Sequence, residues 1–189
     1  MDIHNSTKRP AVFLDRDGTI IEDKGHLSLP SQVSFFEGTV YALRRLNESF
    51  ELFMVTNQSG VARGFLTLQD VDRVNAHLVS CLAEFGVRIA AVYVCPHDSA
   101  DRCSCIKPKP YFIRKAKEEH GIDPARSFAV GDHPHDVEFA RNAGARGIYV
   151  LTGHGIKHKH ELVENTLIVG GIEEAADIIC GSAAGNIQL

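Results

Sequence analysis

Short apolar runs alternate along the chain with longer stretches in which apolar residues recur every three or four positions. The runs are three or four residues long and contain no charged side chain, which is typical of strands buried on both faces of a sheet. The longer stretches have the spacing of amphipathic helices. The pattern predicts strands at residues 11–14, 52–55, 91–94, 128–130 and 148–151, and helices at residues 37–47, 67–85, 110–120, 135–143 and 172–180.

The order of these elements indicates the fold class. Strands that alternate with helices form a parallel sheet that is covered on both faces and joined by right-handed crossovers. We therefore expect an α/β fold, a doubly wound three-layer sandwich. The helix over residues 67–85 has the clearest start, because Thr67 and Asp70 have the spacing of a capping box. In such sheets ligands bind beyond the carboxyl ends of the strands, so chemistry is sought there.

Length and composition fit one ordinary globular domain. The chain has 189 residues, of which 44% are apolar and 23% are charged, so we expect a single domain over residues 1–189. No internal repeat or interdomain linker is evident. We expect the small and polar residues 182–189 to fray.

Charge and hydropathy argue against several classes of partner. With 20 basic and 24 acidic side chains the net charge is −4, and the scattered Lys and Arg argue against nucleic-acid binding. Residues 1–10 are polar, and no later apolar run approaches the length of a membrane span. We therefore expect a cytoplasmic protein without a membrane partner, and a monomer by default.

Acidic and hydroxyl side chains follow three of the predicted strands. A single Asp-x-Asp-Gly match would be explained by a turn, since Asp and Gly are common turn formers. Here three strand ends deliver three carboxylates and a hydroxyl to one rim; the carboxylates would repel one another without a cation, and such oxygen-rich sites suit Mg²⁺. The segments are Asp15-Arg16-Asp17-Gly18-Thr19, Thr56-Asn57-Gln58, and Gly131-Asp132 with Asp136.

These segments resemble the four motifs of the haloacid dehalogenase superfamily, with Lys107 matching the third motif. The resemblance covers nearly the whole chain. Within the superfamily the chain is most similar to the D-glycero-D-manno-heptose 1,7-bisphosphate phosphatases and the related histidinol-phosphate phosphatases. The segment 57–64 and a cysteine-rich loop at residues 95–105 carry this closer similarity.

The residue types and the resemblance together predict a phosphatase mechanism. Asp15 is expected to attack phosphorus and form a phosphoaspartate. Asp17 would protonate the leaving alcohol and then deprotonate the attacking water, and we expect the neighbouring Asp15 carboxylate and partial burial to favour its protonated form. Lys107 and Thr56 would bind the oxygens of the transferring phosphoryl group.

The same comparison predicts the ligands of the catalytic metal. The resemblance implies that Mg²⁺ is held by the carboxylates of Asp15 and Asp132 and by the backbone carbonyl of Asp17. Asp136 would orient a water molecule bound to the metal.

The loop at residues 95–105 predicts a second, structural metal site. Cys95, His97, Cys103 and Cys105 supply three thiolates and an imidazole, which is the ligand set of a closed tetrahedral zinc site. The alternative is a set of free cysteines with a loop histidine. Metal binding also agrees with a reducing compartment, and the zinc would fix a loop next to Lys107.

The spaces between the predicted elements are too short for a folded cap domain. Short loops at residues 22–29 and 59–65, together with the zinc loop, would therefore shape the substrate pocket. Arg63 offers a contact to a second anionic group of a sugar bisphosphate. The candidate substrate contacts are Asp23, His26, Asn57, Gln58, Ser59, Arg63, Ile106 and His133.

Two positions depart from the heptose-phosphatase pattern. The chain has Ile106 where that family has Arg, and His133 where it has Lys, so the attraction for phosphate is weaker at both positions. A heptose bisphosphate is the first choice of substrate, and histidinol phosphate or a broader range of sugar phosphates is the alternative. A third hypothesis is a catalytically inactive, zinc-stabilised binding domain. We interpret the stretch with His154, His158 and His160 as a solvated loop.

Overall fold

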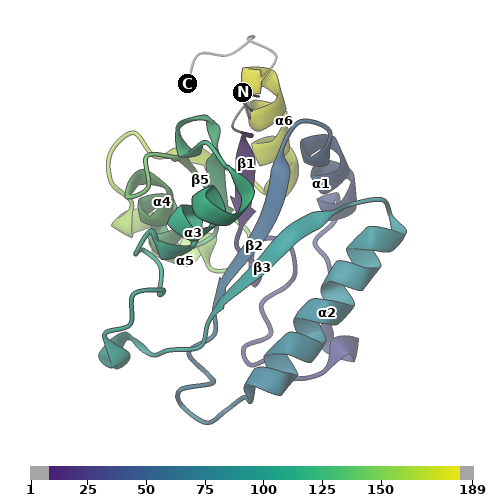
Figure 1. The fold of residues 1–189 in the computed structure, drawn as a ribbon, viewed down its shortest axis with the longest axis vertical. Coiled ribbons are helices and arrows are strands. Elements are labelled where there is room, and N and C mark those ends of the chain that lie inside the picture. Colours follow the sequence, from purple (N-terminus) through teal and green to yellow (C-terminus); the bar gives the residue numbers. More distant parts are fainter. Residues whose placement is uncertain (1–8, 184–189) are drawn as a thin grey trace, which may run out of the picture.

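The computed structural model describes residues 9–183, in which a parallel sheet lies between two layers of helices (Figure 1). The strands are β1 Ala11–Leu14, β2 Glu51–Asn57, β3 Ile89–Cys95, β4 Phe128–Gly131, β5 Arg146–Val150 and β6 Leu167–Val169. The α-helices are α1 Thr39–Asn47, α2 Leu68–Glu84, α3 Tyr111–His120, α4 Pro134–Arg141, α5 Gly155–His158 and α6 Ile172–Ala183. Short 3₁₀ helices are η1 Pro30–Gln32, η2 Ser99–Asp101, η3 Pro124–Arg126 and η4 Lys159–Glu161.

The strand order of the sheet is β3-β2-β1-β4-β5-β6, and each neighbouring pair is parallel. The chain builds one half of the sheet outward from β1 and the other half outward from β4. The order therefore reverses between β1 and β4, which is where a doubly wound sheet opens a crevice at its carboxyl edge. The predicted α/β doubly wound class is confirmed.

Side chains of the central strand β1 separate two apolar cores. Val12 and Leu14 pack into a cluster with α1, α2 and α6, while Ala11 and Phe13 pack into a second cluster with α3 and α4. Phe13 also stacks on Phe53 of β2, with ring centroids 5.1 Å apart. Figure 1 shows the two groups of helices on opposite sides of the strands. Burial on both faces explains why these strands read as uninterrupted apolar runs.

The predicted strands and helices are all present, with ends shifted by a few residues. Strand β6 was not predicted, because it has only three residues and no resolvable periodicity. The interpretation of residues 154–160 as a solvated loop is wrong in part, since α5 and η4 occupy this stretch. Ser182 and Ala183 of the predicted frayed tail belong to α6, and its remaining residues, 184–189, lie outside the described residues.

No folded unit stands between β1 and α1 in the part of the chain described here; that stretch holds only the short helix η1. Isolated β-bridges from Ile21 to Asp17 and to Phe35 hold this stretch in place. Within residues 9–183, none of the helices combines the length and the apolar character needed to cross a bilayer.

The capping box at the start of α2 generates a stability prediction. Thr67 Oγ1 accepts a hydrogen bond from the Asp70 amide, and Asp70 Oδ2 accepts one from the Thr67 amide. Thr67→Ala removes the first bond and should lower the free energy of unfolding by about 1 kcal/mol, measured by urea denaturation. Thr67→Ser keeps the hydroxyl and should stay close to wild type; equal losses in both variants would contradict the assignment.

Candidate active site

A buried lysine lies at the centre of the residues that gather at the carboxyl edge of the sheet. Lys107 is 5% exposed, and its Nζ donates to Asp15 Oδ1 at 2.5 Å, to Asp136 Oδ1 at 2.6 Å and to the Val55 carbonyl at 3.0 Å. Three acceptors therefore satisfy the ammonium group. Burial alone would lower the pKa of Lys107, but the adjacent Asp136 and Asp15 carboxylates outweigh it and raise that pKa above its ordinary value.

Three carboxylates surround this lysine. Asp15 follows β1, Asp132 follows β4, and Asp136 lies in the first turn of α4. Carboxylate oxygens of Asp15, Asp132 and Asp136 all lie within 4.8 Å of one another. One ammonium group does not balance three carboxylates, and a cluster of hard oxygen donors of this size fits Mg²⁺.

The charge imbalance is visible in the pKa values of the carboxyl groups. Burial raises the pKa of Asp15 well above its usual range, the Asp136 and Asp132 carboxylates raise it further, and Lys107 lowers it. Burial, with Asp136 nearby, also raises the pKa of Asp132 to about 6, although the His154 amide that donates to Asp132 Oδ2 at 2.7 Å opposes the shift. A dication bound here would relieve this repulsion.

The turn after β1 requires glycine. Gly18 has a φ of +79°, and a Cβ atom at this position would lie 2.0 Å from Asp132 Oδ2. Its carbonyl accepts a hydrogen bond from Thr152 Oγ1 at 2.7 Å. The turn can therefore pass close to the end of β4 only without a side chain.

Asp17 is held by donors on two sides. The guanidinium of Arg16, which is fully buried, donates to both carboxylate oxygens of Asp17 at 3.0 and 3.1 Å and to Asn75 Oδ1 at 2.8 Å. Gln58 Nε2 donates to Asp17 Oδ2 and to Thr56 Oγ1, each at 2.8 Å. Together these donors fix the position of the Asp17 carboxyl group beside Thr56.

A cavity of about 210 Å³ opens at this edge of the sheet. Asn57 contributes to its shape by pairing with the backbone of Lys107, whose amide donates to Asn57 Oδ1 at 3.1 Å. The structure thus brings together most of the predicted site residues. The cavity is lined by Asp15, Asp17, Asp23, Thr56, Asn57, Lys107, Asp132, His133, His135 and Asp136.

Five of the predicted substrate contacts do not line this cavity, and one of them, Gln58, instead donates to Asp17 and Thr56. His26 stacks on Phe65, with ring centroids 4.8 Å apart. Arg63 pairs with Asp98 of the cysteine-rich loop. Ile106 packs against the apolar core, so it contributes no polar group. The backbone carbonyl of Ser59 accepts the Arg63 amide in the turn after β2.

Sequence reasoning missed several residues at the site. His135 lines the cavity, and its signal was available, because it lies between His133 and Asp136 in the motif at the end of β4. The roles of Arg16 and Asn75 carried no such signal, since their pairing joins residues 59 positions apart.

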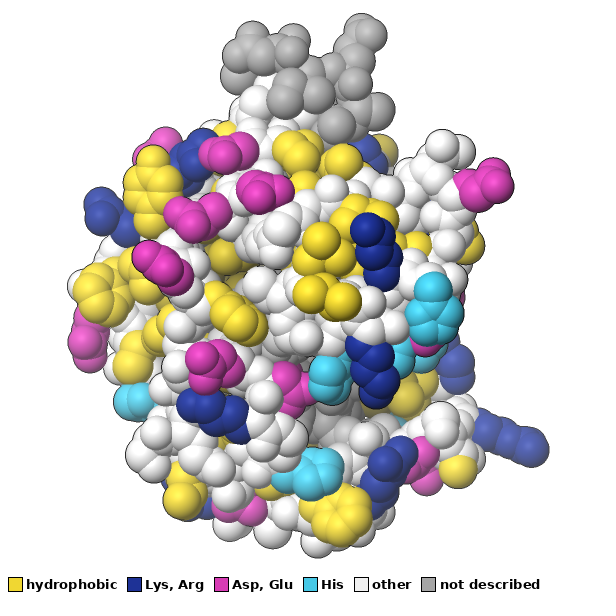
Figure 2. Space-filling model, turned by 180° about the vertical axis from the view of Figure 1, so that it is seen from behind, with side chains coloured by type: hydrophobic (Ala, Val, Ile, Leu, Met, Phe, Trp, Pro, Cys, Tyr) yellow, Lys and Arg dark blue, Asp and Glu magenta, His cyan; other side chains and the backbone are white. Residues whose placement is uncertain are grey.

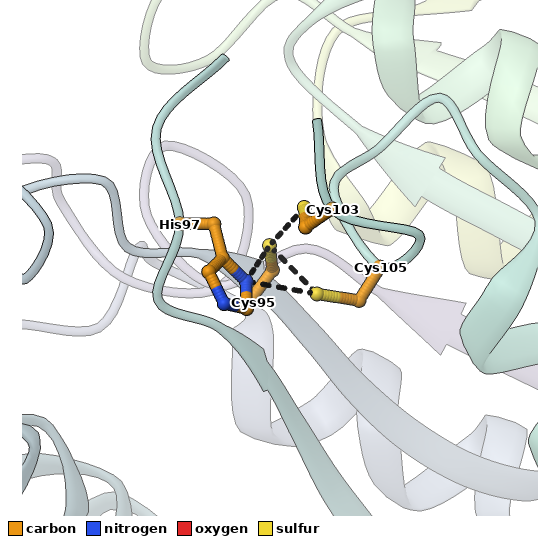
Figure 3. Close-up of side chains that lie close together, drawn as sticks. All are labelled: Cys95, His97, Cys103 and Cys105. Atoms are coloured by element: carbon orange, nitrogen blue, oxygen red, sulfur yellow. Dashed lines mark hydrogen bonds between the residues drawn. The ribbon is translucent and has the colours of Figure 1, made fainter. Parts of the chain in front are cut away.

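The four predicted zinc ligands converge at the end of β3 (Figure 3). Cys95 Sγ lies 3.7 Å from Cys103 Sγ and 3.1 Å from Cys105 Sγ. His97 Nδ1 lies 3.7 Å from Cys95 Sγ and 3.3 Å from Cys105 Sγ. Tetrahedral zinc, with bonds of about 2.3 Å to sulfur and about 2.0 Å to nitrogen, requires donor atoms roughly 3.5 Å apart. The cluster is therefore compatible with zinc.

Comparison with known proteins gives one consistent family. The HAD-hydrolase-like family model matches residues 104–175. A D-glycero-beta-D-manno-heptose-1,7-bisphosphate 7-phosphatase of Helicobacter pylori is 36% identical over 160 residues, which cover 84% of this chain and 92% of the relative. The enzyme of that name from Haemophilus ducreyi is also 36% identical, over 85% of this chain and 95% of its own.

Solved structures agree with the sequence relatives. A D,D-heptose 1,7-bisphosphate phosphatase from B. bronchiseptica, complexed with magnesium and phosphate, superimposes with a TM-score of 0.84 at 29% identity, over 92% of this chain and 99% of that chain. The enzyme of that name from Burkholderia thailandensis gives a TM-score of 0.68, also at 29% identity, over 90% and 97% of the two chains. This chain therefore belongs to the haloacid dehalogenase-like hydrolases, in the family of the heptose bisphosphate phosphatases.

Proposed function

We propose that this protein is a Mg²⁺-dependent phosphatase that removes the C7 phosphate of D-glycero-β-D-manno-heptose 1,7-bisphosphate. The observation that carries the proposal is the contact of Lys107 with Asp15 and Asp136 beside a third carboxylate, Asp132. This arrangement provides a nucleophile, a cation and metal ligands within one small cavity. The names of the relatives support the substrate and its β anomer.

Asp15 is the nucleophile in this proposal. One carboxylate oxygen forms a bond to phosphorus, and the bond from phosphorus to the sugar oxygen breaks. Because burial disfavours the ionised form of Asp15, the Lys107 ammonium at 2.5 Å helps to keep the carboxylate charged. Bound Mg²⁺ would be held by Asp15, Asp132 and the Asp17 carbonyl, with Asp136 beside it, and would supply charge that neutralises the phosphoryl oxygens.

Asp17 is the general acid and base in this proposal. It donates one to the leaving sugar oxygen, and it later accepts one from the water that attacks the phosphoaspartate, which releases phosphate and regenerates Asp15. The donors from Arg16 and Gln58 fix the orientation of the carboxyl group. Asp17 must carry a proton when the substrate binds, and the proton that it takes from the attacking water restores this form for the next turnover.

The size of the cavity limits what part of the substrate it holds. About 210 Å³ is below the usual range for a whole small-molecule ligand, which begins near 300 Å³, and fits a phosphoryl group with its adjoining carbons. Lys107 and Thr56 bind the phosphoryl oxygens. The rest of the sugar bisphosphate then lies outside the cavity, over the loops that carry His26, Ser59 and Arg63.

The histidinol-phosphate alternative rests on one observation. Ile106 packs into the core and brings no cation towards the substrate, which leaves room for a less selective site. A substrate panel separates the two possibilities.

We also propose that the cysteine cluster holds a structural zinc, in a single-domain, monomeric and cytoplasmic protein. The cysteines among the described residues form no disulfide, which agrees with a reducing compartment. The zinc ties η2 and its flanking loop to the end of β3, close to Lys107.

Replacement of the nucleophile tests the chemistry. Asp15→Asn should lower phosphate release from the heptose bisphosphate by roughly 10³-fold or more, because an amide cannot form the acyl phosphate. Asp72→Asn is the matched control, because Asp72 is an exposed carboxylate on α2. Phosphate release is measured with both anomers of the heptose bisphosphate and with histidinol phosphate. Preference for histidinol phosphate would contradict the proposed substrate but not the proposed mechanism.

Leaving-group dependence tests the role of Asp17. Asp17→Asn should lower the rate of hydrolysis of the sugar substrate by about 10² to 10⁴-fold. Hydrolysis of an aryl phosphate should fall much less, because a phenolate leaves without being protonated. Rates of phosphate release are compared at saturating Mg²⁺. If both substrates are slowed equally, Asp17 is not the general acid.

Metal analysis tests the zinc site. Elemental analysis should find about one equivalent of zinc less in Cys105→Ser than in the wild-type protein, and the melting temperature of this variant should fall by at least about 5 °C. Cys81→Ser is the control, because Cys81 lies on α2 beside His77, outside the cluster. Equal zinc content in wild type and Cys105→Ser would refute the site.

A further inference from the structure

Another group of metal-binding side chains lies beside the cavity, apart from the carboxylate cluster and the cysteine loop. Ligand atoms of His133, His158 and Glu161 all lie within 4.8 Å of one another. His133 caps α4 after β4, while His158 and Glu161 come from α5 and η4 after β5. Figure 2 shows histidine side chains gathered on one face of the molecule, next to acidic side chains and a hollow.

The three side chains are held in place by contacts among themselves and with the active site. The rings of His133 and His158 are 4.7 Å apart between centroids, and His158 Nδ1 is 2.6 Å from Glu161 Oε1. His158 is 20% exposed and Glu161 is 42% exposed at the side chain, so the group is accessible to an ion from solution. The helix α5 that carries His158 is anchored by the His154 amide, which donates to Asp132.

Two imidazoles and a carboxylate form the ligand set of zinc sites that keep an open coordination position. Imidazole ligands also suit other transition metals, whereas Mg²⁺ prefers oxygen donors and waters. With bonds of about 2.0 to 2.1 Å, the donor atoms would lie roughly 3.4 Å apart, so the more distant atoms would approach and the His158–Glu161 pair would open from 2.6 Å and exchange its hydrogen bond for bonds to the metal. We propose that His133, His158 and Glu161 bind one transition-metal dication of the Zn²⁺ type at the rim of the cavity.

The position of this ion gives it a role towards the substrate, a step that rests on the proposed function. His133 lines the cavity together with Asp132 and Asp136. Among the described residues that line it, Lys107 is the only lysine or arginine, and its charge is shared by Asp15 and Asp136. The open position of the rim ion accepts an anionic oxygen from the part of the phosphorylated substrate that extends beyond the cavity.

Calorimetric titration with Zn²⁺ tests the site directly. The protein is first loaded at the cysteine cluster and kept in millimolar Mg²⁺, which occupies the carboxylates. The wild type should then bind one further equivalent of Zn²⁺. His158→Ala and Glu161→Gln should each weaken this binding at least tenfold, because each removes a ligand. His160→Ala is the matched control, because His160 lies in the same stretch with a 78% exposed side chain and is outside the group.

Each outcome decides the proposal. No further equivalent in the wild type, unchanged binding in His158→Ala, or an equal loss in His160→Ala overturns the site. Circular dichroism establishes that the variants are folded, and the stoichiometry of the wild type decides the question if one is not. The titration contains no substrate, so its failure leaves the proposed phosphatase activity untouched. Loss of activity in Asp15→Asn with normal Zn²⁺ binding would likewise separate the two.

The role towards the substrate has its own readout. One equivalent of Zn²⁺ added to the cysteine-loaded enzyme should lower KM for the bisphosphate several-fold, with little change in kcat, since the ion binds a part of the substrate that does not react. The effect should be absent in His158→Ala. An unchanged KM in the wild type would restrict the ion to a structural role and overturn this step.

Discussion

Lys107 places a buried positive charge where the ends of β1 and β4 meet. Asp15 and Asp136 accept hydrogen bonds from its ammonium group. Without this charge, three carboxylates would face one another in a region of low dielectric. Removing one partner of such a buried group typically costs about 3–5 kcal/mol, because the remaining charge is left uncompensated. The lysine thus stabilises the ligand-free arrangement and, in the proposed mechanism, keeps Asp15 ionised for attack on phosphorus. The other contacts at this edge build on its position.

The neighbouring side chains are placed by the same close approach. Gly18 allows the turn after β1 to approach Asp132 Oδ2, and the amide of His154 donates to the same oxygen. Arg16 crosses beneath the turn and joins Asp17 to Asn75 on α2. The orientation of Asp17, the acid/base group of the proposed mechanism, therefore depends on the packing of a helix that does not itself line the cavity.

Apolar patterning and the strand-end rule account for most of what could be predicted. They placed Asp15, Thr56 and Asp132 on one rim, since burial on both faces makes the strands recognisable. The surroundings of His26 and Arg63 could not be predicted, because their partners come from other loops whose paths are set by tertiary contacts. The proximity of His158 to His133 could not be predicted from the sequence for the same reason.

The pairing of β1 with β4 has a consequence for biosynthesis. The amide of Ala11 donates to Ser127 across 116 positions, so the first strand has no partner on that side until the chain has been made well beyond its midpoint. Contacts of such long sequence separation form slowly, and an unpaired strand edge invites association with other chains. During translation, the strand that precedes Asp15 is therefore an aggregation hazard before it is part of an enzyme.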